Sequence, residues 1–189
     1  MPRLFTAIEI PVEVRERLAA LRGGLPGARW IGPENYHLTL RFIGDVDMDT
    51  AESAAEALSR VHRPPFDLAL SGVEALGTRK PHAIVARVTP TPPLIELQAE
   101  HERLCQRIGL APEGRKYTPH VTLARIGYCT ARDIAEYLGL RGGFAVGPFT
   151  VDRFVLYSSR NSVGGGPYVV EEAYPLVASA TRAVAGARR

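Results

Sequence analysis

The chain has 189 residues, 46% of them hydrophobic, and a formal net charge of +3. This composition can fill a hydrophobic core, which excludes a disordered chain, and no stretch has the length and apolarity of a transmembrane helix. Because the first ten residues are too mixed for a signal peptide, we expect a soluble cytoplasmic protein. The mild positive charge permits a nucleic-acid partner, but the preference for arginine over lysine also fits a GC-rich genome.

Hydrophobic periodicity predicts alternating strands and helices in the first half of the chain. A strand over 4–10 precedes a helix that begins at Pro11 and ends at Gly23-Gly24. The further elements are a short strand over 29–31, a strong strand over 36–43, a helix over 49–61, and strands over 66–71 and 83–88. Gly44-Asp45 ends the strong strand, as turn residues do.

The second half repeats this kind of order. The longest helix is predicted over 94–108, after Pro92-Pro93 and closed by Gly109. A strand over 120–126 follows, and Thr130 caps a helix that runs to Leu138. Two final strands over 149–158 and 168–175 are predicted to pair across the glycine run 164–166, and a frayed tail is predicted from 181.

This order predicts an α+β fold in which the same layout is used twice. We expect two similar lobes, each an antiparallel sheet with helices on its outer face, with a central cleft between the lobes. No linker separates the halves, so residues 1–189 are expected to form a single bilobal domain.

One short motif occurs twice, as His37-Leu-Thr39-Leu and His120-Val-Thr122-Leu. Side chains alternate between the faces of a strand, so the histidine and threonine of each copy lie on one face. The apolar residues between and after them lie on the other face and anchor the strand in a core. A single His-x-Thr is a common strand pattern, but two copies in similar contexts favour a function.

Two imidazoles and two hydroxyls match the needs of a reaction that opens a cyclic phosphodiester. One histidine can take a proton from water while the other gives a proton to the departing ribose oxygen, because histidine titrates close to neutral pH. The hydroxyls of Thr39 and Thr122 can donate hydrogen bonds to phosphate oxygens. We therefore expect no cofactor and no metal.

The remaining histidines and the cysteines are predicted to be structural. His62 precedes a loop with Pro64-Pro65, His82 follows Pro81, and His101 is expected on the polar side of its helix. Cys105 and Cys129 lie far apart, which favours buried reduced thiols over a zinc site or a disulfide. No carboxylate stands at ligand spacing beside the motif histidines, so zinc is not expected there.

Further substrate contacts are predicted from the residues around the motif. Arg41 lies on the histidine face of its strand by alternation and is expected to rim the cleft for the RNA backbone. Alternation places Arg125 on the opposite face, but a bulge would turn it inward, so a phosphate contact and a surface position both remain open. Phe5, Tyr36 and Trp30 could stack on a base, with core packing the favoured fate of Trp30.

At this point the sequence resembles the 2H phosphoesterase superfamily, and within it the bacterial and archaeal RNA 2',3'-cyclic phosphodiesterases, also named 2'-5' RNA ligases. The likeness covers nearly the whole chain. The matching segments are 3–8, 29–30, 37–44 (His-Leu-Thr-Leu-Arg-Phe-Ile-Gly), 117–125 (Tyr-Thr-Pro-His-Val-Thr-Leu-Ala-Arg), 156–160 and 174–176.

The resemblance implies a bilobal fold whose cleft is lined by both motifs, and hydrolysis of a 2',3'-cyclic phosphate to a 2'-phosphomonoester. It implies that His37 is the proton donor to the leaving 3'-oxygen, that His120 is the base that acts on water, and that Thr39 and Thr122 hold the phosphate. The motif copies are too symmetric for the residues alone to assign acid and base.

Three functions thus remain in view. The leading one is hydrolysis of RNA 2',3'-cyclic phosphate ends, by an enzyme expected to act as a monomer without a membrane partner. The second is a 2'-5' RNA ligase or an RNA-end binding module; the absence of a Walker-type loop argues against use of a nucleoside triphosphate. The third is a phosphodiesterase for another cyclic nucleotide.

Overall fold

Nine strands and four α-helices, with one 3-10 helix, form the part of the chain that this computed structural model describes, residues 2–77, 80–159 and 166–177. In chain order they are β1 (Arg3–Glu9), α1 (Val12–Ala19), β2 (Ala28–Trp30), η1 (Pro33–Asn35), β3 (His37–Asp45), α2 (Met48–Leu58), β4 (Phe66–Leu76), β5 (Ala83–Val88), α3 (Pro92–Arg107), β6 (His120–Ile126), α4 (Ala131–Arg141), β7 (Ala145–Val151), β8 (Arg153–Ser159) and β9 (Tyr168–Pro175).

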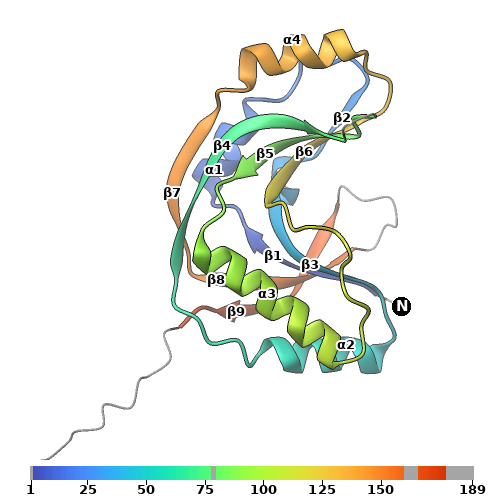
Figure 1. The fold of residues 1–189 in the computed structure, drawn as a ribbon, viewed down its shortest axis with the longest axis vertical. Coiled ribbons are helices and arrows are strands. Elements are labelled where there is room, and N and C mark those ends of the chain that lie inside the picture. The colour runs from blue at the N-terminus through green and yellow to red at the C-terminus, as the bar shows by residue number, and fades with distance from the viewer. Residues whose placement is uncertain (1, 78–79, 160–165, 178–189) are drawn as a thin grey trace, which may run out of the picture.

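The nine strands form one antiparallel sheet, and its two halves, referred to below as the first and second sheets, meet where β3 pairs with β6 (Figure 1). One lobe contains β3, β1, β8 and β9 in spatial order, and the other contains β6, β5, β4 and β7. The sheets are joined by the single registered pair Leu38↔Val121 between β3 and β6, and β2 pairs with the far half of β6. The predicted α+β fold of two lobes is confirmed.

Helices cover both sheets, but α1 and α3 each pack on the lobe other than the one that contains the preceding strand. Helix α1 follows β1 yet contacts β7 of the other lobe, and α3 follows β5 yet contacts β3. Helices α2 and α3 therefore cover the first sheet, while α4 lies over the second, at the opposite end of the molecule (Figure 1). None of the described helices is long and apolar enough to cross a bilayer.

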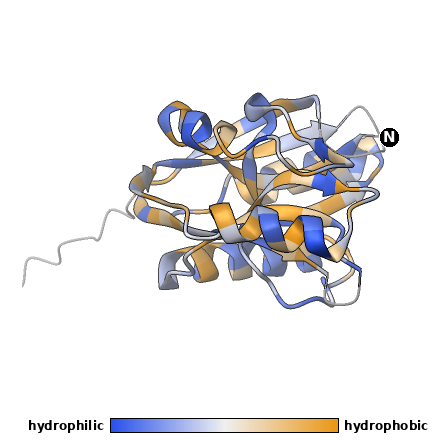
Figure 2. Ribbon diagram, turned by 90° about the horizontal axis from the view of Figure 1, so that it is seen from above, coloured by the Kyte–Doolittle hydropathy of each residue, from blue (hydrophilic) through white to orange (hydrophobic). Residues whose placement is uncertain are grey.

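A continuous hydrophobic core runs beneath both sheets and fixes the two motif strands. Leu38 and Leu40 of β3 and Val121 and Leu123 of β6 are all buried in it. Figure 2 shows apolar colouring concentrated in the strands, whereas the helices carry both apolar and polar residues. Burial of this apolar surface is the main force that holds the two strands in place.

The strand predicted over 149–158 is two strands, because the chain changes lobes at Asp152. β7 pairs with β4 in one sheet, whereas β8 pairs with β1 and β9 in the other. Two consecutive polar residues, Asp152 and Arg153, interrupt the apolar alternation at this break, but they do not show that the chain enters another sheet. The predicted pairing of the last two strands is confirmed for β8 and β9. Residues 164 and 165 of the glycine run and the tail from 181 lie outside the described residues.

Candidate active site

A cavity of about 670 Å³ opens where β3 and β6 diverge. His37 and Thr39 from β3 line one side of it, and His120, Thr122 and Arg125 from β6 line the other. Both copies of the motif therefore face a single cavity, although 80 residues of chain separate them.

The register of β3 and β6 explains how the motif residues meet. Leu38 pairs with Val121, and both side chains are buried on the core face. One residue further in each direction, antiparallel pairing sets His37 opposite Thr122 and Thr39 opposite His120. Side chains opposite one another on antiparallel strands have Cβ atoms about 5 Å apart, close enough for both sides to contact one phosphate group.

The two imidazoles are oriented by matching hydrogen bonds. His37 Nδ1 lies 2.8 Å from the carbonyl oxygen of Asn35, and His120 Nδ1 lies 2.7 Å from that of Thr118. A carbonyl oxygen only accepts, so each Nδ1 carries a proton and donates it. Nε2 of each ring is thereby left to exchange protons with a substrate.

Aromatic side chains surround His37. Its ring centroid lies 5.0 Å from that of Phe5, 5.8 Å from Tyr157 and 5.0 Å from Tyr168. Burial among these rings lowers the pKa of His37 to about 4; the Asn35 hydrogen bond opposes the shift, and the charges of His120 and Arg125 add to it. Without a substrate, His37 is therefore neutral at physiological pH.

Burial also lowers the pKa of His120, and the hydrogen bond to Thr118 opposes the shift. Arg125 and His82 lower this pKa further, whereas Glu74 raises it. Arg125 thus acts on both imidazoles, which places its charge within reach of each. An anion bound between the rings would raise both pKa values, because negative charge favours the protonated form.

Arg125 reaches the cavity because of a β-bulge in β6. Thr122 pairs with Val85 and Ala124 with Ile84, so Leu123 is the extra residue. An extra residue reverses the alternation beyond it, and the exposed Arg125 returns to the face of His120 and Thr122. Of the two positions left open from the sequence, the structure has the one at the cavity wall.

Arg41 lies on the opposite face of its strand from the one predicted, and the cause is again a β-bulge. A bulge at Leu40, between the pairs Ala7↔Thr39 and Thr6↔Arg41, turns its side chain away from the face of His37. Arg41 is only 7% exposed and its Nε lies 2.5 Å from Oε2 of Glu102 on α3. Arg41 lines the cavity beside Glu102, so the predicted strand face was wrong, while its contact with the RNA backbone stays a prediction.

Phe5 also differs from expectation. Its ring lies at the cavity but is only 2% exposed, because Phe42, Tyr157 and Tyr168 pack around it. Phe5 therefore supports His37 and offers no open face to a base. Phe42, which follows the bulge, is 41% exposed at the cavity, stacks on Phe5 and has the guanidinium carbon of Arg3 5.4 Å from its ring centroid.

Tyr36 and Trp30 pack in the protein instead of stacking on a ligand. Tyr36 is 2% exposed, and Trp30 packs against Tyr137 with ring centroids 5.7 Å apart. The core position favoured for Trp30 is confirmed.

Several cavity residues were missed from the sequence. His82 precedes β5, is exposed and lines the cavity near His120. The segment between α3 and β6 supplies a whole wall through Glu113, Arg115, Lys116 and Tyr117. Tyr117 lies in the segment 117–125 that resembles the family, but no sequence signal marked the others, because only the folded chain brings them to the motif.

His101 was assigned to the polar side of its helix, and this was wrong. It is fully buried, with Nδ1 2.8 Å from the hydroxyl oxygen of Thr6 and its ring edge-on to Phe154. Cys105 is buried as expected, whereas Cys129 is only partly buried, and both are free thiols. Among the described residues, no three His, Cys, Asp or Glu side chains gather as a metal site.

Solved structures with the same architecture give the class of the protein. The E. coli LigT structure complexed with 3'-AMP superimposes with a TM-score of 0.74 and 26% identity, covering 93% of this chain and 99% of that one. The fold is shared also with TT0787 of Thermus thermophilus, at a TM-score of 0.79 and 23% identity, over 94% of this chain and 99% of that chain. The class is that of the LigT-type 2H phosphoesterases.

Sequence comparison agrees. Residues 8–85 and 88–168 match the family described as LigT like Phosphoesterase, and the chain belongs to this family. It is 32% identical over 175 residues to the RNA 2',3'-cyclic phosphodiesterase of Thermotoga maritima, covering 89% of this chain and 92% of that protein. The protein of the same name from Geobacillus stearothermophilus is 31% identical over 128 residues, 64% of this chain and 41% of that protein. The resemblance found from the motifs is confirmed.

Proposed function

We propose that this protein hydrolyses the 2',3'-cyclic phosphate at an RNA end to a 2'-phosphomonoester without a metal ion. The observation that carries the proposal is the pairing of two His-x-Thr motifs across one cavity, with Arg125 within electrostatic reach of both imidazoles. The names of the relatives support it, as does the 3'-AMP bound to E. coli LigT, since both point to nucleotide phosphates.

The hydrolysis needs one proton taken and one proton given. His120 Nε2 takes a proton from water, whose oxygen forms a bond to phosphorus. The bond from phosphorus to the 3'-oxygen breaks, and His37 Nε2 gives its proton to that oxygen. The histidines end with exchanged protonation states and reset through solvent.

The other residues stabilise the phosphate as charge moves onto its oxygens. The hydroxyls of Thr39 and Thr122 donate hydrogen bonds to the two non-bridging oxygens, and Arg125 supplies a positive charge. The bound phosphate anion also favours the protonated form of His37, which takes up its proton from solvent. His37 has a pKa of about 4 in the free protein, and an anion beside the ring raises that pKa toward neutrality.

The choice of His37 as acid and His120 as base rests on the family resemblance. Both rings have the same type of Nδ1 contact, so their hydrogen bonds do not distinguish the roles. A substrate whose 3'-leaving group needs no protonation separates them. The His37→Ala variant should recover rate on such a substrate, and the His120→Ala variant should not.

The test is to incubate the purified protein with adenosine 2',3'-cyclic phosphate in EDTA and to identify the monoester that forms. His37→Ala and His120→Ala should each lose at least about 10²-fold in kcat, the usual scale for loss of a general acid or base. His62→Ala, an exposed histidine outside the cavity lining, is the matched control. No product, or activity that chelation abolishes, contradicts the proposal.

The same assay separates the competing functions. A longer RNA formed from a cyclic-phosphate end and a 5'-hydroxyl end would identify a ligase, and retention of RNA without turnover would identify a binding module. E. coli LigT has also been solved with NADP+ and ATP, so mononucleotide, dinucleotide and ADP-ribose cyclic phosphates belong in the panel.

A further inference from the structure

The segment between α3 and β6 has neither helix nor strand, yet it forms one wall of the cavity. It brings Arg115 and Lys116 to the cavity, and both side chains are exposed. A loop of this length needs specific contacts to keep one conformation, because its ordering costs backbone entropy.

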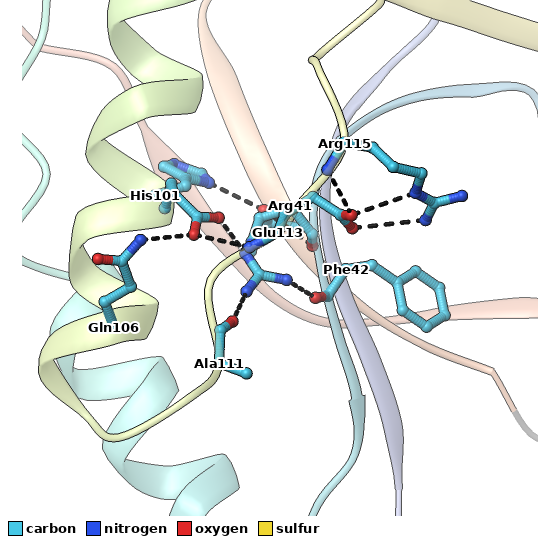
Figure 3. Close-up of polar contacts among 9 residues, drawn as sticks. Arg41, Phe42, His101, Gln106, Ala111, Glu113 and Arg115 are labelled. Carbon is cyan, nitrogen blue, oxygen red and sulfur yellow. Dashed lines mark hydrogen bonds and ion pairs between the residues drawn. The ribbon is translucent and has the colours of Figure 1, made fainter.

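Those contacts begin at a largely buried ion pair (Figure 3). Arg41 Nε lies 2.5 Å from Glu102 Oε2, with side chains that are 7% and 18% exposed. A second guanidinium nitrogen donates to the carbonyl oxygen of Ala111 at 2.5 Å, and the third donates to that of Phe42. Arg41 therefore ties β3 and α3 to the start of the segment.

Glu102 completes the attachment with its other oxygen. Oε1 accepts the backbone N–H of Glu113 at 3.0 Å and the side-chain amide of Gln106 at 2.7 Å. Glu113 in turn holds Arg115, with Nε 3.1 Å from its Oε1. The Arg41–Glu102 pair thus binds Ala111 and Glu113 directly, and Glu113 in turn binds Arg115.

The end of the segment next to His120 is held separately. Tyr117 donates its hydroxyl hydrogen to the carbonyl oxygen of Thr39 at 3.1 Å, and the carbonyl oxygen of Pro119 accepts the N–H of Val88 at 3.1 Å. We therefore expect a change in the position of residues 111–116 to leave the reacting groups in place. The Arg41–Glu102 pair acts on the part of the wall that lies away from the imidazoles.

The phosphate chemistry itself does not need a buried arginine at this position. The equivalent residue of the second motif is Ala124, two residues beyond Thr122 as Arg41 is beyond Thr39. Burying an ion pair carries a large desolvation cost that an apolar pair avoids. The pair at Arg41 is thus explained by the segment that it holds, which brings Arg115, Lys116 and one carboxylate, Glu113, to the cavity.

We propose that Arg41 and Glu102 are positioning residues for a second subsite, in which Arg115 and Lys116 bind the phosphate of the nucleotide that precedes the cyclic end. The proposal rests on the proposed hydrolysis and deepens it, because it makes RNA, as opposed to a mononucleotide, the preferred substrate. Arginine and lysine at the cavity wall suit a phosphate diester of this kind.

The test compares two substrates on one variant. In the double variant Arg41→Met with Glu102→Leu, apolar side chains of similar length replace the ion pair, a change that often leaves stability unaltered. KM should rise about tenfold for a cyclic-phosphate dinucleotide, the scale of one lost charged contact, and less than about threefold for the mononucleotide. The kcat of both substrates should stay within about threefold.

Arg63→Met is the matched control, since Arg63 pairs with Glu96 and Glu100 on the same helix without touching the segment. Lys116→Gln, an exposed change, should reproduce the dinucleotide effect without any risk to folding. Hydrogen exchange at 111–116 should speed up in the double variant only, and this readout needs no activity.

Unchanged exchange in the double variant, an equal rise in both KM values, or the same effects in Arg63→Met would overturn the proposal. Failure of the wild type to hydrolyse either substrate would instead refute the proposed function, and the exchange result would still report on the ion pair.

Discussion

His101 gives a sharp prediction about stability because it is a titratable group buried without a charged partner. Its ring is fully buried, bonded to the Thr6 hydroxyl and packed edge-on against Phe154 at 4.5 Å. Burial lowers its pKa from 6.5 to about 3, and the charge of Arg63 contributes to the same shift. The folded protein therefore keeps this histidine neutral under conditions in which the unfolded chain protonates it.

The sign and size of the pH dependence of stability follow from the difference in the pKa of His101 between the folded and unfolded states. Below pH 6.5 the unfolded state binds a proton that the folded state does not bind, so stability falls as the pH falls. Each pH unit below 6.5 removes up to about 1.4 kcal/mol, which amounts to about 3 kcal/mol between pH 8 and pH 4.5. The loss continues until the pH approaches the folded pKa of about 3.

The measurement is the free energy of unfolding from urea titrations at several pH values between 8 and 4.5. His101→Gln retains a group that can bond to Thr6 but cannot titrate, so its curve should be flatter than that of the wild type by about 3 kcal/mol over this range. His62→Gln removes an exposed histidine and should leave the slope unchanged. Parallel curves for the wild type and His101→Gln would show that His101 is protonated in the folded state.

Three further predictions concern the cavity. Thr39→Val and Thr122→Val keep the shape of the side chain but remove one hydroxyl, and each should lower kcat about 10²-fold in single-turnover assays with little change in melting temperature. Arg125→Met should move the acid limb of the kcat/KM profile to higher pH, because Arg125 lowers the pKa of both cavity imidazoles; an unmoved limb would contradict this. Phe42→Ala should raise KM for a nucleoside cyclic phosphate about tenfold, but not for glycerol cyclic phosphate, which has no base to stack; equal effects on both would exclude stacking.

The fold could be predicted from the sequence wherever local pattern decides structure. Alternation defined the motif strands, and prolines and glycines marked the ends of α3. The crossing at Asp152 escaped detection because two consecutive polar residues mark a bulge within one strand as readily as a crossing to another sheet. The exchange of α1 and α3 between the lobes was equally invisible, since an amphipathic helix does not encode which sheet it covers.

For the candidate site, the paired motif residues were found from sequence and the surrounding wall was not. His37 and His120 carry a repeated pattern, whereas Lys116 lies in an irregular segment that long-range contacts of Glu102 and Tyr117 hold at the cavity. His101 was placed on the wrong face because histidine is usually polar; the Thr6 hydroxyl that lets it be buried lies 95 residues away. Contacts of this range are set by tertiary packing, which local periodicity does not record.

The bulges in β3 and β6 explain how two equal motifs make an unequal site. Up to the threonine, alternation gives both strands the same histidine and hydroxyl toward the cavity. The leucine after it is the extra residue in each strand, so the next side chain, Arg41 or Ala124, turns to the buried core face, and the one after that, Phe42 or Arg125, returns to the cavity. One strand therefore presents an aromatic ring and the other a cation just beyond a symmetric pair of imidazoles. A nucleoside cyclic phosphate carries an apolar base at one end and a negatively charged phosphate at the other. We therefore expect the difference between Phe42 and Arg125, and not the motif itself, to set the direction in which the substrate binds.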